Sequence, residues 1–435
     1  MRRFLLSAAL VAACGVASAQ KLTYYPWTSN GYLQAITCSQ NGQFIGGEDM
    51  PGQAFIANMK TGEIKYFASE HIGEDTGDND ACVNSVNDEG VGFGYFEGHA
   101  AKFDFNTGEY TKLSDESSLV KSATSDAALA FGVTYDKGYN QFPCFWNAEG
   151  TKSSLPTFSD EVLGYETMGY KVMQASADGS TVVGAAIDNF STYPMVIWHR
   201  NNDGQTYSLN VASRRFFDGS FTLTGFQKYD KVTAEAVSAN GKWVALSIHD
   251  KATDEDGYAP LYGQVIARYD VEADTLGLIE CPDASPELFY NANGIANDGT
   301  IIASTEDQNT YATKAFICPA RSSKAIAMSE AFPEIKELQT MDANELNQPC
   351  AISGDGRYIV GYGYVDYDDK NLCLGSYVID TKSSTTGVEN VAEGEESSKV
   401  VASYDIEGKK ISNPTNNRLV INRLANGKSV KRIVK

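Results

Sequence analysis

The sequence predicts an all-β chain assembled from one repeated unit of four strands, and three observations support this prediction. Glycine and tyrosine are abundant, at 39 and 24 of 435 residues, which favours turns and strands over helices. A short phrase with an Asp-Gly turn, clearest at Gln174–Gly184, returns along the chain. The copies stand at intervals of roughly 37 to 62 residues, which is the range expected for propeller blades.

The repeated phrase is a hairpin signal, because Asp-Gly and Asn-Gly adopt the positive φ values that tight turns require. A second clear copy is Ala351–Gly361. The third copy has lost the glycine of its turn, yet Asp126 stands six residues before Gly132, as Asp178 stands before Gly184. Aligned on the turn, the seven copies are Ser39–Gly42, Asn87–Gly90, Ser125–Ala128, Ser176–Gly179, Ser238–Gly241, Ala296–Gly299 and Ser353–Gly356.

Each turn leads into a strand such as Thr181–Gly184, then a variable polar loop and a further strand such as Lys314–Cys318. A second turn precedes a fourth strand such as Glu63–Phe67. Four strands repeated seven times predict a seven-bladed β-propeller over residues 20–382. The last unit lacks a clear fourth strand, so we expect Lys21–Tyr25 to supply it and leave no open sheet edge.

The chain begins like a secretory signal peptide over residues 1–19. Two arginines precede the apolar run Phe4–Ala13, and Ala17-Ser-Ala19 forms a cleavage site. Neither this run nor a later stretch is long enough to span a membrane. We therefore expect a secreted or outer cell-surface protein. Because Val11–Cys14 resembles a lipobox, lipidation of Cys14 stays open as the alternative.

The composition changes near Ser383. Residues 383–399 form a polar linker, and residues 400–435 are basic where the propeller is acidic. Strand-like segments in this tail are separated by Glu407-Gly408 and Asn426-Gly427 turns. We expect a small C-terminal β-sandwich-like domain here.

Two resemblances to known families accompany these patterns. The phrase and the Ala-Phe-x-x-Trp-like strand that follows it resemble the extracellular propeller repeats of bacterial proteins that are sometimes called HAF repeats. The segments Ser403–Ile411, Arg418–Arg423 and Asn426–Lys435 resemble the C-terminal sorting domain of the type IX secretion system of Bacteroidetes. This resemblance implies a partner in the type IX secretion machinery. The segment Asn417–Leu419 stands where that family usually has a glycine-containing segment. Neither family implies a substrate.

Composition and motifs argue against several kinds of chemistry. A net charge of -21 is unsuited to binding nucleic acid, which needs a positive field. The seven cysteines left after export have no CxxC pair, and the four histidines follow no HExxH pattern. Cys144 and Cys318 lie inside apolar runs and are expected to be small buried hydrophobes. We assign no catalytic residue and no cofactor, although Ca²⁺ at the acidic runs 74–80, 250–256 and 366–369 stays open.

Geometry predicts the binding surface. In a propeller, the loops between the second and third strands of the blades share one face, and here they are rich in tyrosine, which offers apolar area and a hydroxyl with little loss of entropy. Ordinary packing at strand ends is the competing explanation. The predicted ligand-binding residues are Tyr135, Tyr139, Tyr193, Tyr258, Tyr262, Tyr311, Tyr364 and Tyr367.

We therefore predict a monomeric, non-catalytic propeller that binds a glycan or protein ligand through this tyrosine-rich face. The alternative is a secreted enzyme acting on polysaccharide with carboxylates near the propeller channel. Two carboxyl groups about 5 to 9.5 Å apart in a pocket would favour that enzyme.

Overall fold

The computed structural model describes most of the predicted propeller and the strands of the C-terminal tail. The described residues are 21–25, 33–49, 52–70, 80–163, 166–187, 195–209, 229–250, 265–282, 288–307, 309–310, 313–335, 338, 348–368, 371–381, 400–404, 410–411, 418–424 and 429–434. The chain divides into two units by internal contacts, Gln20–Thr381 and a second unit that includes Lys382–Lys435. No helix among the described residues is both long enough and apolar enough to cross a membrane.

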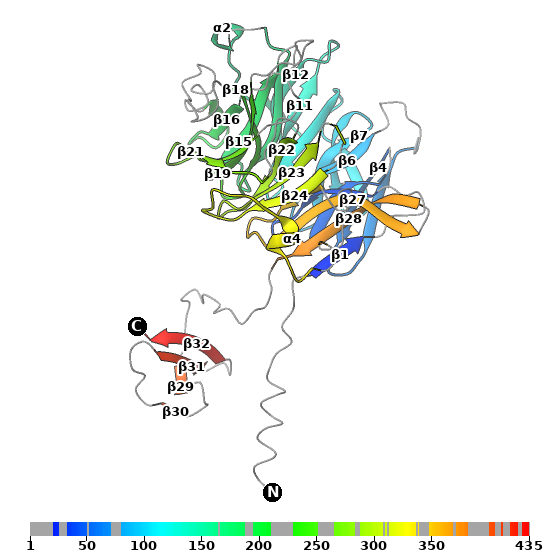
Figure 1. Ribbon diagram of the computed structural model, residues 1–435. Coiled ribbons are helices and arrows are strands. Elements are labelled where there is room, and N and C mark those ends of the chain that lie inside the picture. Colours follow the sequence, from blue (N-terminus) through cyan, green and yellow to red (C-terminus); the bar gives the residue numbers. More distant parts are fainter. Residues whose placement is uncertain are drawn as a thin grey trace. The chain divides into compact units, whose positions relative to one another are not determined.

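The larger unit is a seven-bladed β-propeller, which confirms the predicted fold class (Figure 1). Each blade has four antiparallel strands, and in blades 1 to 6 consecutive strands in the chain are neighbours in the sheet. A short parallel contact between Gln141 and Gly169 joins blades 3 and 4 into one larger sheet. Blades 1 to 3 are β2 (Gln34–Cys38), β3 (Phe44–Glu48), β4 (Gln53–Asn58) and β5 (Ile64–Ala68); β6 (Ala81–Val86), β7 (Val91–Phe96), β8 (His99–Asp104) and β9 (Glu109–Lys112); and β10 (Ser118–Ala123), β11 (Leu129–Tyr135), β12 (Gln141–Asn147) and β13 (Lys152–Ser154).

Blades 4 to 6 continue the same order around the ring. They are β14 (Gly169–Ala175), β15 (Thr181–Ile187), β16 (Met195–Arg200) and β17 (Tyr207–Leu209); β18 (Tyr229–Val237), β19 (Trp243–Asp250), β20 (Val265–Asp270) and β21 (Thr275–Ile279); and β22 (Leu288–Ile295), β23 (Ile301–Asp307), β24 (Thr313–Cys318) and β25 (Ile326–Ala327). The four-residue helices α2 (Asp160–Leu163) and α4 (Met328–Ala331) follow blades 3 and 6.

Blade 7 joins the two ends of the propeller. Its strands are β26 (Gln348–Ile352), β27 (Tyr358–Asp368), β28 (Asn371–Asp380) and β1 (Lys21–Tyr25). β1 pairs antiparallel with β28, from Lys21 opposite Asp380 to Tyr25 opposite Ser376, and Figure 1 shows blue β1 beside orange β28. The predicted closure of the ring by Lys21–Tyr25 is confirmed. This pairing occupies the edge of β28 that the last repeat would otherwise leave exposed.

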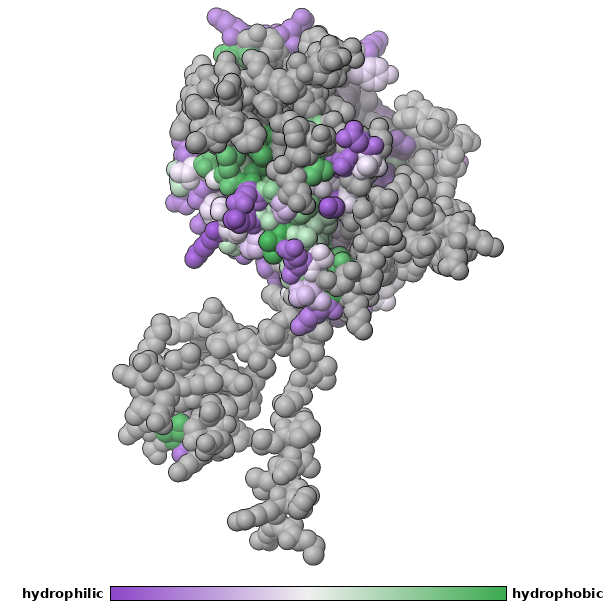
Figure 2. Space-filling view, in the orientation of Figure 1, coloured by the Kyte–Doolittle hydropathy of each residue, from purple (hydrophilic) through white to green (hydrophobic). Residues whose placement is uncertain are grey.

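Apolar side chains between neighbouring blades form the core. Phe131 of blade 3 lies in one apolar cluster with Val182 and Trp198 of blade 4, and all three are fully buried. Cys144 and Cys318 are buried in similar clusters, which confirms their predicted role as small hydrophobes. On the face drawn in Figure 2, hydrophilic and hydrophobic residues alternate over the described surface.

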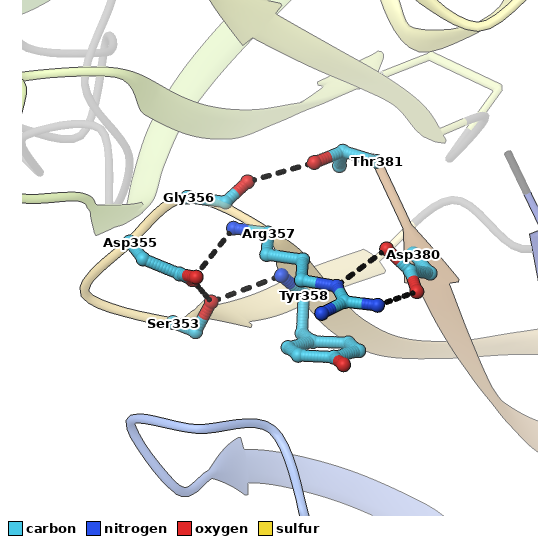
Figure 3. A network of polar contacts seen from close by, with 7 residues as sticks. All are labelled: Ser353, Asp355, Gly356, Arg357, Tyr358, Asp380 and Thr381. Carbon is cyan, nitrogen blue, oxygen red and sulfur yellow. Dashed lines mark hydrogen bonds and ion pairs between the residues drawn. The ribbon is translucent and has the colours of Figure 1, made fainter. Parts of the chain in front are cut away.

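Five of the seven repeated turns share one hydrogen-bonding pattern, which Figure 3 shows in the seventh copy. The Ser353 hydroxyl donates to Asp355 at 2.8 Å and accepts the backbone N–H of Tyr358 at 2.9 Å. Asp355 accepts the backbone N–H of Arg357 at 3.0 Å. Arg357 in turn forms two hydrogen bonds with Asp380 of β28, at 2.9 and 2.8 Å. The phrase therefore folds into a polar turn that is tied to its own sheet.

The third copy shows the same pattern one residue earlier than the sequence alignment placed it. The hydroxyl of Thr124, not that of Ser125, donates to Asp126 at 2.6 Å and accepts the N–H of Leu129 at 3.0 Å. Ala127 has φ +58° and occupies the position of the turn glycine. The alignment at Ser125–Ala128 is therefore wrong by one residue, because it matched Ser125 to the serine of the other copies. Asp126 takes the place of Asp178, which makes Thr124 the first residue of the turn.

The turns also bond to one another and complete a circle through all seven blades. Every junction between neighbouring blades has a hydrogen bond from residues of the repeated phrase. These bonds are Asn41 N to Asp88 Oδ1 at 2.8 Å, Asn87 Nδ2 to Ser125 O at 3.0 Å, Ser125 N to Ala177 O at 2.8 Å, Ala177 N to Ala239 O at 2.8 Å, Asn240 N to Asn297 Oδ1 at 2.7 Å, Asn297 N to Gly354 O at 2.8 Å and Gly354 N to Gln40 Oε1 at 2.9 Å.

The C-terminal unit contains one described antiparallel sheet of four strands in the order β30-β29-β31-β32. These strands are β29 (Val400–Tyr404), β30 (Lys410–Ile411), β31 (Arg418–Leu424) and β32 (Ser429–Val434). They correspond to the strand-like segments that the sequence indicates in the tail.

Candidate functional site

The structure describes only part of the predicted tyrosine-rich face. Tyr193, Tyr258, Tyr262 and Tyr311 lie outside the described residues. Tyr364 and Tyr367 were expected in a loop but belong to β27, which pairs with β28 as far as Asp368 opposite Asn371. Tyr135 is likewise the last residue of β11. These three loop placements are wrong, because the strands continue through residues that polar neighbours made look like a loop.

Tyr135 and Tyr139 have different surroundings although they are four residues apart. Tyr135 is half-buried and packs against the apolar cluster between blades 3 and 4, which fits ordinary strand-end packing. Tyr139 is 81% exposed, the most exposed of the large hydrophobic side chains described. Phe142, three residues further on in β12, is 49% exposed. Two accessible aromatic rings therefore flank one short loop.

Hydrogen bonds hold this loop, Asp136–Asn140, in a defined shape. Asp136 Oδ1 accepts the backbone N–H groups of Gly138 at 2.7 Å and Asn140 at 3.0 Å. The Asn140 side chain donates to Asp136 Oδ2 at 2.9 Å, and the Tyr139 N–H donates to the Asp136 carbonyl at 3.0 Å. The hydrogen bond from the Asn140 side chain is the main reason that the pKa of Asp136 lies below its usual range. The carboxylate is therefore the centre of the loop.

The backbone at Tyr139 is strained, and the next blade supports it. Tyr139 has φ +61°, a left-handed conformation that costs a residue other than glycine about 1–3 kcal/mol. The N–H of Gln141 donates to Met168 O at 3.0 Å, and Gln141 pairs with Gly169 at the start of blade 4. The backbone of the loop is thus fixed to two blades, so little backbone freedom is lost when a ligand binds to the exposed ring.

The second candidate region is the central channel, which sequence reasoning did not identify by residue. Each innermost strand contains a β-bulge at the same position, where one extra residue interrupts the pairing with the second strand. All seven extra residues line one cavity of about 220 Å³. In blade order they are Ile36, Asn84, Lys121, Met173, Glu235, Asn293 and Cys350.

A fixed spacing could have located these channel residues. Each stands three positions before the first residue of the repeated turn, as Met173 stands before Ser176 and Glu235 before Ser238. The correct first residue of the third turn, Thr124, points in the same way to Lys121. Bulged residues have no sequence marker of their own, so the repeat alignment is the only signal.

The channel contains opposite charges. Lys121 and Glu235 line the cavity from blades 3 and 5, and Lys171 of blade 4 interacts electrostatically with both. Burial lowers the pKa of Lys121, and it raises the pKa of Glu235 despite hydrogen bonds from Thr233 and Ser247. Glu235 is the single carboxylate among the described residues that line this cavity.

The described residues hold no group of three or more His, Cys, Asp or Glu side chains placed to bind a metal. The acidic runs proposed for Ca²⁺ lie almost entirely among residues or side chains outside the described set. The possible Ca²⁺ sites therefore stay predictions.

No family model and no curated protein matches the sequence. Among solved structures, the chain is similar to the β-propeller domain of Cps50 (Swd1) from Myceliophteria thermophila, with 9% identity, a TM-score of 0.49, and coverage of 82% of this chain and 99% of that chain. It is also similar to TolB from Acinetobacter baumannii, with 13% identity, a TM-score of 0.36, and coverage of 74% of this chain and 68% of that chain. The propeller assignment itself rests on the strand pairings described above.

Proposed function

We propose that this chain is an exported, non-catalytic β-propeller that binds a glycan through the Asp136–Asn140 loop. The observation that carries the proposal is the 81% exposed ring of Tyr139, held in a strained conformation by hydrogen bonds to Asp136. Strained residues of this kind often mark ligand sites, because the surrounding structure must compensate for their cost.

The size and chemistry of the loop favour a sugar over a protein partner. A stable protein interface buries about 800 Å² on each partner, usually around several apolar anchors. Here the described loop offers two exposed rings, Tyr139 and Phe142, beside the carboxylate of Asp136 and the amide of Asn140. An aromatic ring can pack against one face of a sugar ring, and the adjacent polar groups can hydrogen-bond to its hydroxyls. These groups together are enough for a small sugar-binding site.

A glycan array followed by calorimetry on the chosen glycan tests this proposal. We expect the Tyr139→Ala variant to lose at least about tenfold in affinity, equivalent to about 1.4 kcal/mol. Tyr110→Ala is the matched control, because Tyr110 is 41% exposed and lies in the outer strand β9 of another blade. Equal losses in both variants, or no loss at Tyr139, would contradict the proposal. Binding to a protein but to no glycan would establish the alternative ligand class.

The enzymatic alternative is tested with the same purified protein. The proposal predicts that the glycan selected on the array is recovered intact after prolonged incubation. Release of reducing ends that is lost in Glu235→Gln would instead support a channel enzyme, since Glu235 is the carboxylate that lines the described cavity.

Export and sorting form a separate part of the proposal. The signal-like residues 1–19 and the resemblance of residues 400–435 to type IX sorting domains support secretion to the outer surface. In a Bacteroidetes host, we expect the complete chain outside the cell, or on its surface, and a variant ending at Thr381 in the periplasm. Equal export of both chains would contradict a sorting role for the tail.

A further inference from the structure

Lys121 occupies an unusual position in the central channel. It is the extra residue of the bulge in β10, so its side chain extends toward the axis among the inner strands of the other blades. Solvent reaches it along the channel, but the surrounding protein still lowers its pKa, with burial as the largest cause. Within the described part of the chain, no hydrogen bond or ion pair engages its ammonium group.

The neighbouring charges do not neutralise Lys121. Lys171 of the next blade lowers its pKa further, while Cys82 and Glu48 act in the opposite direction without exceeding the effect of burial. Glu235 lies two blades away and forms a hydrogen bond of 2.5 Å with the Thr233 hydroxyl. Because water rather than a protein group surrounds this ammonium, an anion from solution can form a charge-assisted hydrogen bond with it without breaking an existing ion pair.

The other groups around the cavity are suited to hydroxyl groups rather than to a second charge. Asn84 and Asn293 stand at the equivalent bulges of blades 2 and 6, and Gln174 follows the bulge of blade 4. Each carboxamide has one hydrogen bond within the protein: Asn84 donates to Val120 O, Asn293 donates to Ser304 Oγ, and Gln174 accepts the N–H of Val237. Their remaining amide donors and acceptors can bind the hydroxyls of a ligand. The cavity of about 220 Å³ lies below the ~300–1,000 Å³ of drug-sized pockets, so it suits a ligand of monosaccharide size.

We propose that the central channel is a second binding site, which holds a small hydroxylated carboxylate with its carboxylate group at Lys121 and its hydroxyls on the surrounding carboxamides. This site is distinct from the Tyr139 loop. Lys121 is not one of the residues that hold that loop, and a ligand at the channel would not require Tyr139.

Isothermal titration calorimetry on the mature chain, residues 20–435, tests this proposal with D-glucuronate and D-glucose. The two sugars differ at one carbon, so their comparison isolates the carboxylate. We expect glucuronate to bind at least tenfold more tightly than glucose. We expect Lys121→Met to remove that preference, and Lys314→Met, which changes an exposed lysine of β24, to keep it.

The possible outcomes either support the channel site or exclude it. A preference for glucuronate that depends on Lys121 and survives in Tyr139→Ala supports the channel site. No detectable glucuronate binding, equal binding of the two sugars, or an unchanged preference in Lys121→Met overturns it. Circular dichroism and thermal unfolding confirm that each variant is folded. Loss of the glucuronate preference in Tyr139→Ala would overturn the separation of the two sites.

Discussion

The two ends of the blades differ in how their sequences relate to structure. At one end, the turns between first and second strands repeat one phrase and bond to one another around the ring. At the other end, the loops between second and third strands share no phrase, and the loop Asp136–Asn140 of blade 3 holds an exposed tyrosine. Uniform sequence builds the scaffold, whereas the residues that vary between blades are free to acquire binding roles.

The largest effect on the scaffold is expected at the glycine that ends the repeated phrase. A Cβ atom at Gly184 would lie 2.0 Å from the carbonyl oxygen of Lys171, which the bulge in β14 brings over the second strand. We expect Gly184→Ala to lower the free energy of unfolding by about 3 kcal/mol, because backbone rather than a flexible side chain must move. Denaturant unfolding measures this change.

Gly277→Ala is the matched control for that substitution. Its nearest neighbour, the carbonyl of Arg268, would lie 3.8 Å from the new Cβ atom, and Gly277 belongs to the outer strand β21. We expect a change within about 0.5 kcal/mol. Similar losses at Gly184 and Gly277 would show that the close approach at the bulge does not explain the glycine.

The channel lies between the two ends, and Lys121 is expected to destabilise the unliganded protein. Lys121→Met removes a charge that lacks a direct partner but is reached by solvent, so we expect the free energy of unfolding to rise by no more than about 1 kcal/mol near neutral pH. The pKa of Lys121 is lowered in the folded state, so the unfolded chain binds its proton more strongly. The wild type therefore gains stability as pH rises through this pKa, and the advantage of the variant shrinks. Denaturant unfolding from pH 7 to 10 measures it, and a variant less stable than wild type at pH 7 would contradict this account.

The turn end allows a smaller and more specific test. The sixth copy has Ala296 where most copies have a hydroxyl that accepts the N–H five residues later, as Ser353 accepts that of Tyr358. The sixth turn is also one residue shorter, because the Ala296 N–H donates to the carbonyl of Thr300, four residues on, whereas the Ser353 N–H donates to that of Tyr358, five residues on. The N–H of Thr300 already donates to Asp298 at 2.9 Å, so we expect Ala296→Ser to change the free energy of unfolding by no more than about 0.5 kcal/mol. Thermal unfolding is the measurement, and a clearly stabilised variant would show that the shorter turn can still use the hydroxyl.

The repeats made the propeller predictable, because most of its turns share one sequence and one set of hydrogen bonds. The missing fourth strand of the last repeat was the reason to expect the closing strand Lys21–Tyr25, which pairs as predicted. The one misaligned copy shows the limit of this reasoning. Ala127 adopts the left-handed conformation of the missing glycine, and its neighbours, not its own identity, impose it.

The candidate sites were less predictable, since they depend on where strands end and bulge. β27 and β28 stay paired as far as Asp368, so Tyr364 and Tyr367 lie in a strand although their polar neighbours indicate a loop. Phe142 shows no local pattern that separates it from core residues, and Lys121 is found only by its spacing from a turn that the alignment misplaced by one residue. Their exposure follows from pairing between strands, which short-range sequence does not specify.

The central claim is that the two ends divide stability and recognition between them, and one paired measurement tests it. The Ser176 hydroxyl donates to Asp178 at 2.8 Å and accepts the N–H of Thr181 at 3.0 Å, so Ser176→Ala should cost about 1–2 kcal/mol of stability. Tyr139 is exposed, and alanine at φ +61° keeps the same left-handed strain, so Tyr139→Ala should leave stability within about 0.5 kcal/mol.

Thermal unfolding and glycan affinity are therefore measured on both variants and on the wild type. We predict that Ser176→Ala unfolds at a lower temperature and binds with unchanged affinity, whereas Tyr139→Ala unfolds no earlier and loses at least about tenfold in affinity. Two results would contradict this separation of stability from recognition. One is a loss of both thermal stability and glycan affinity in each variant, and the other is a loss of glycan affinity in Ser176→Ala but not in Tyr139→Ala.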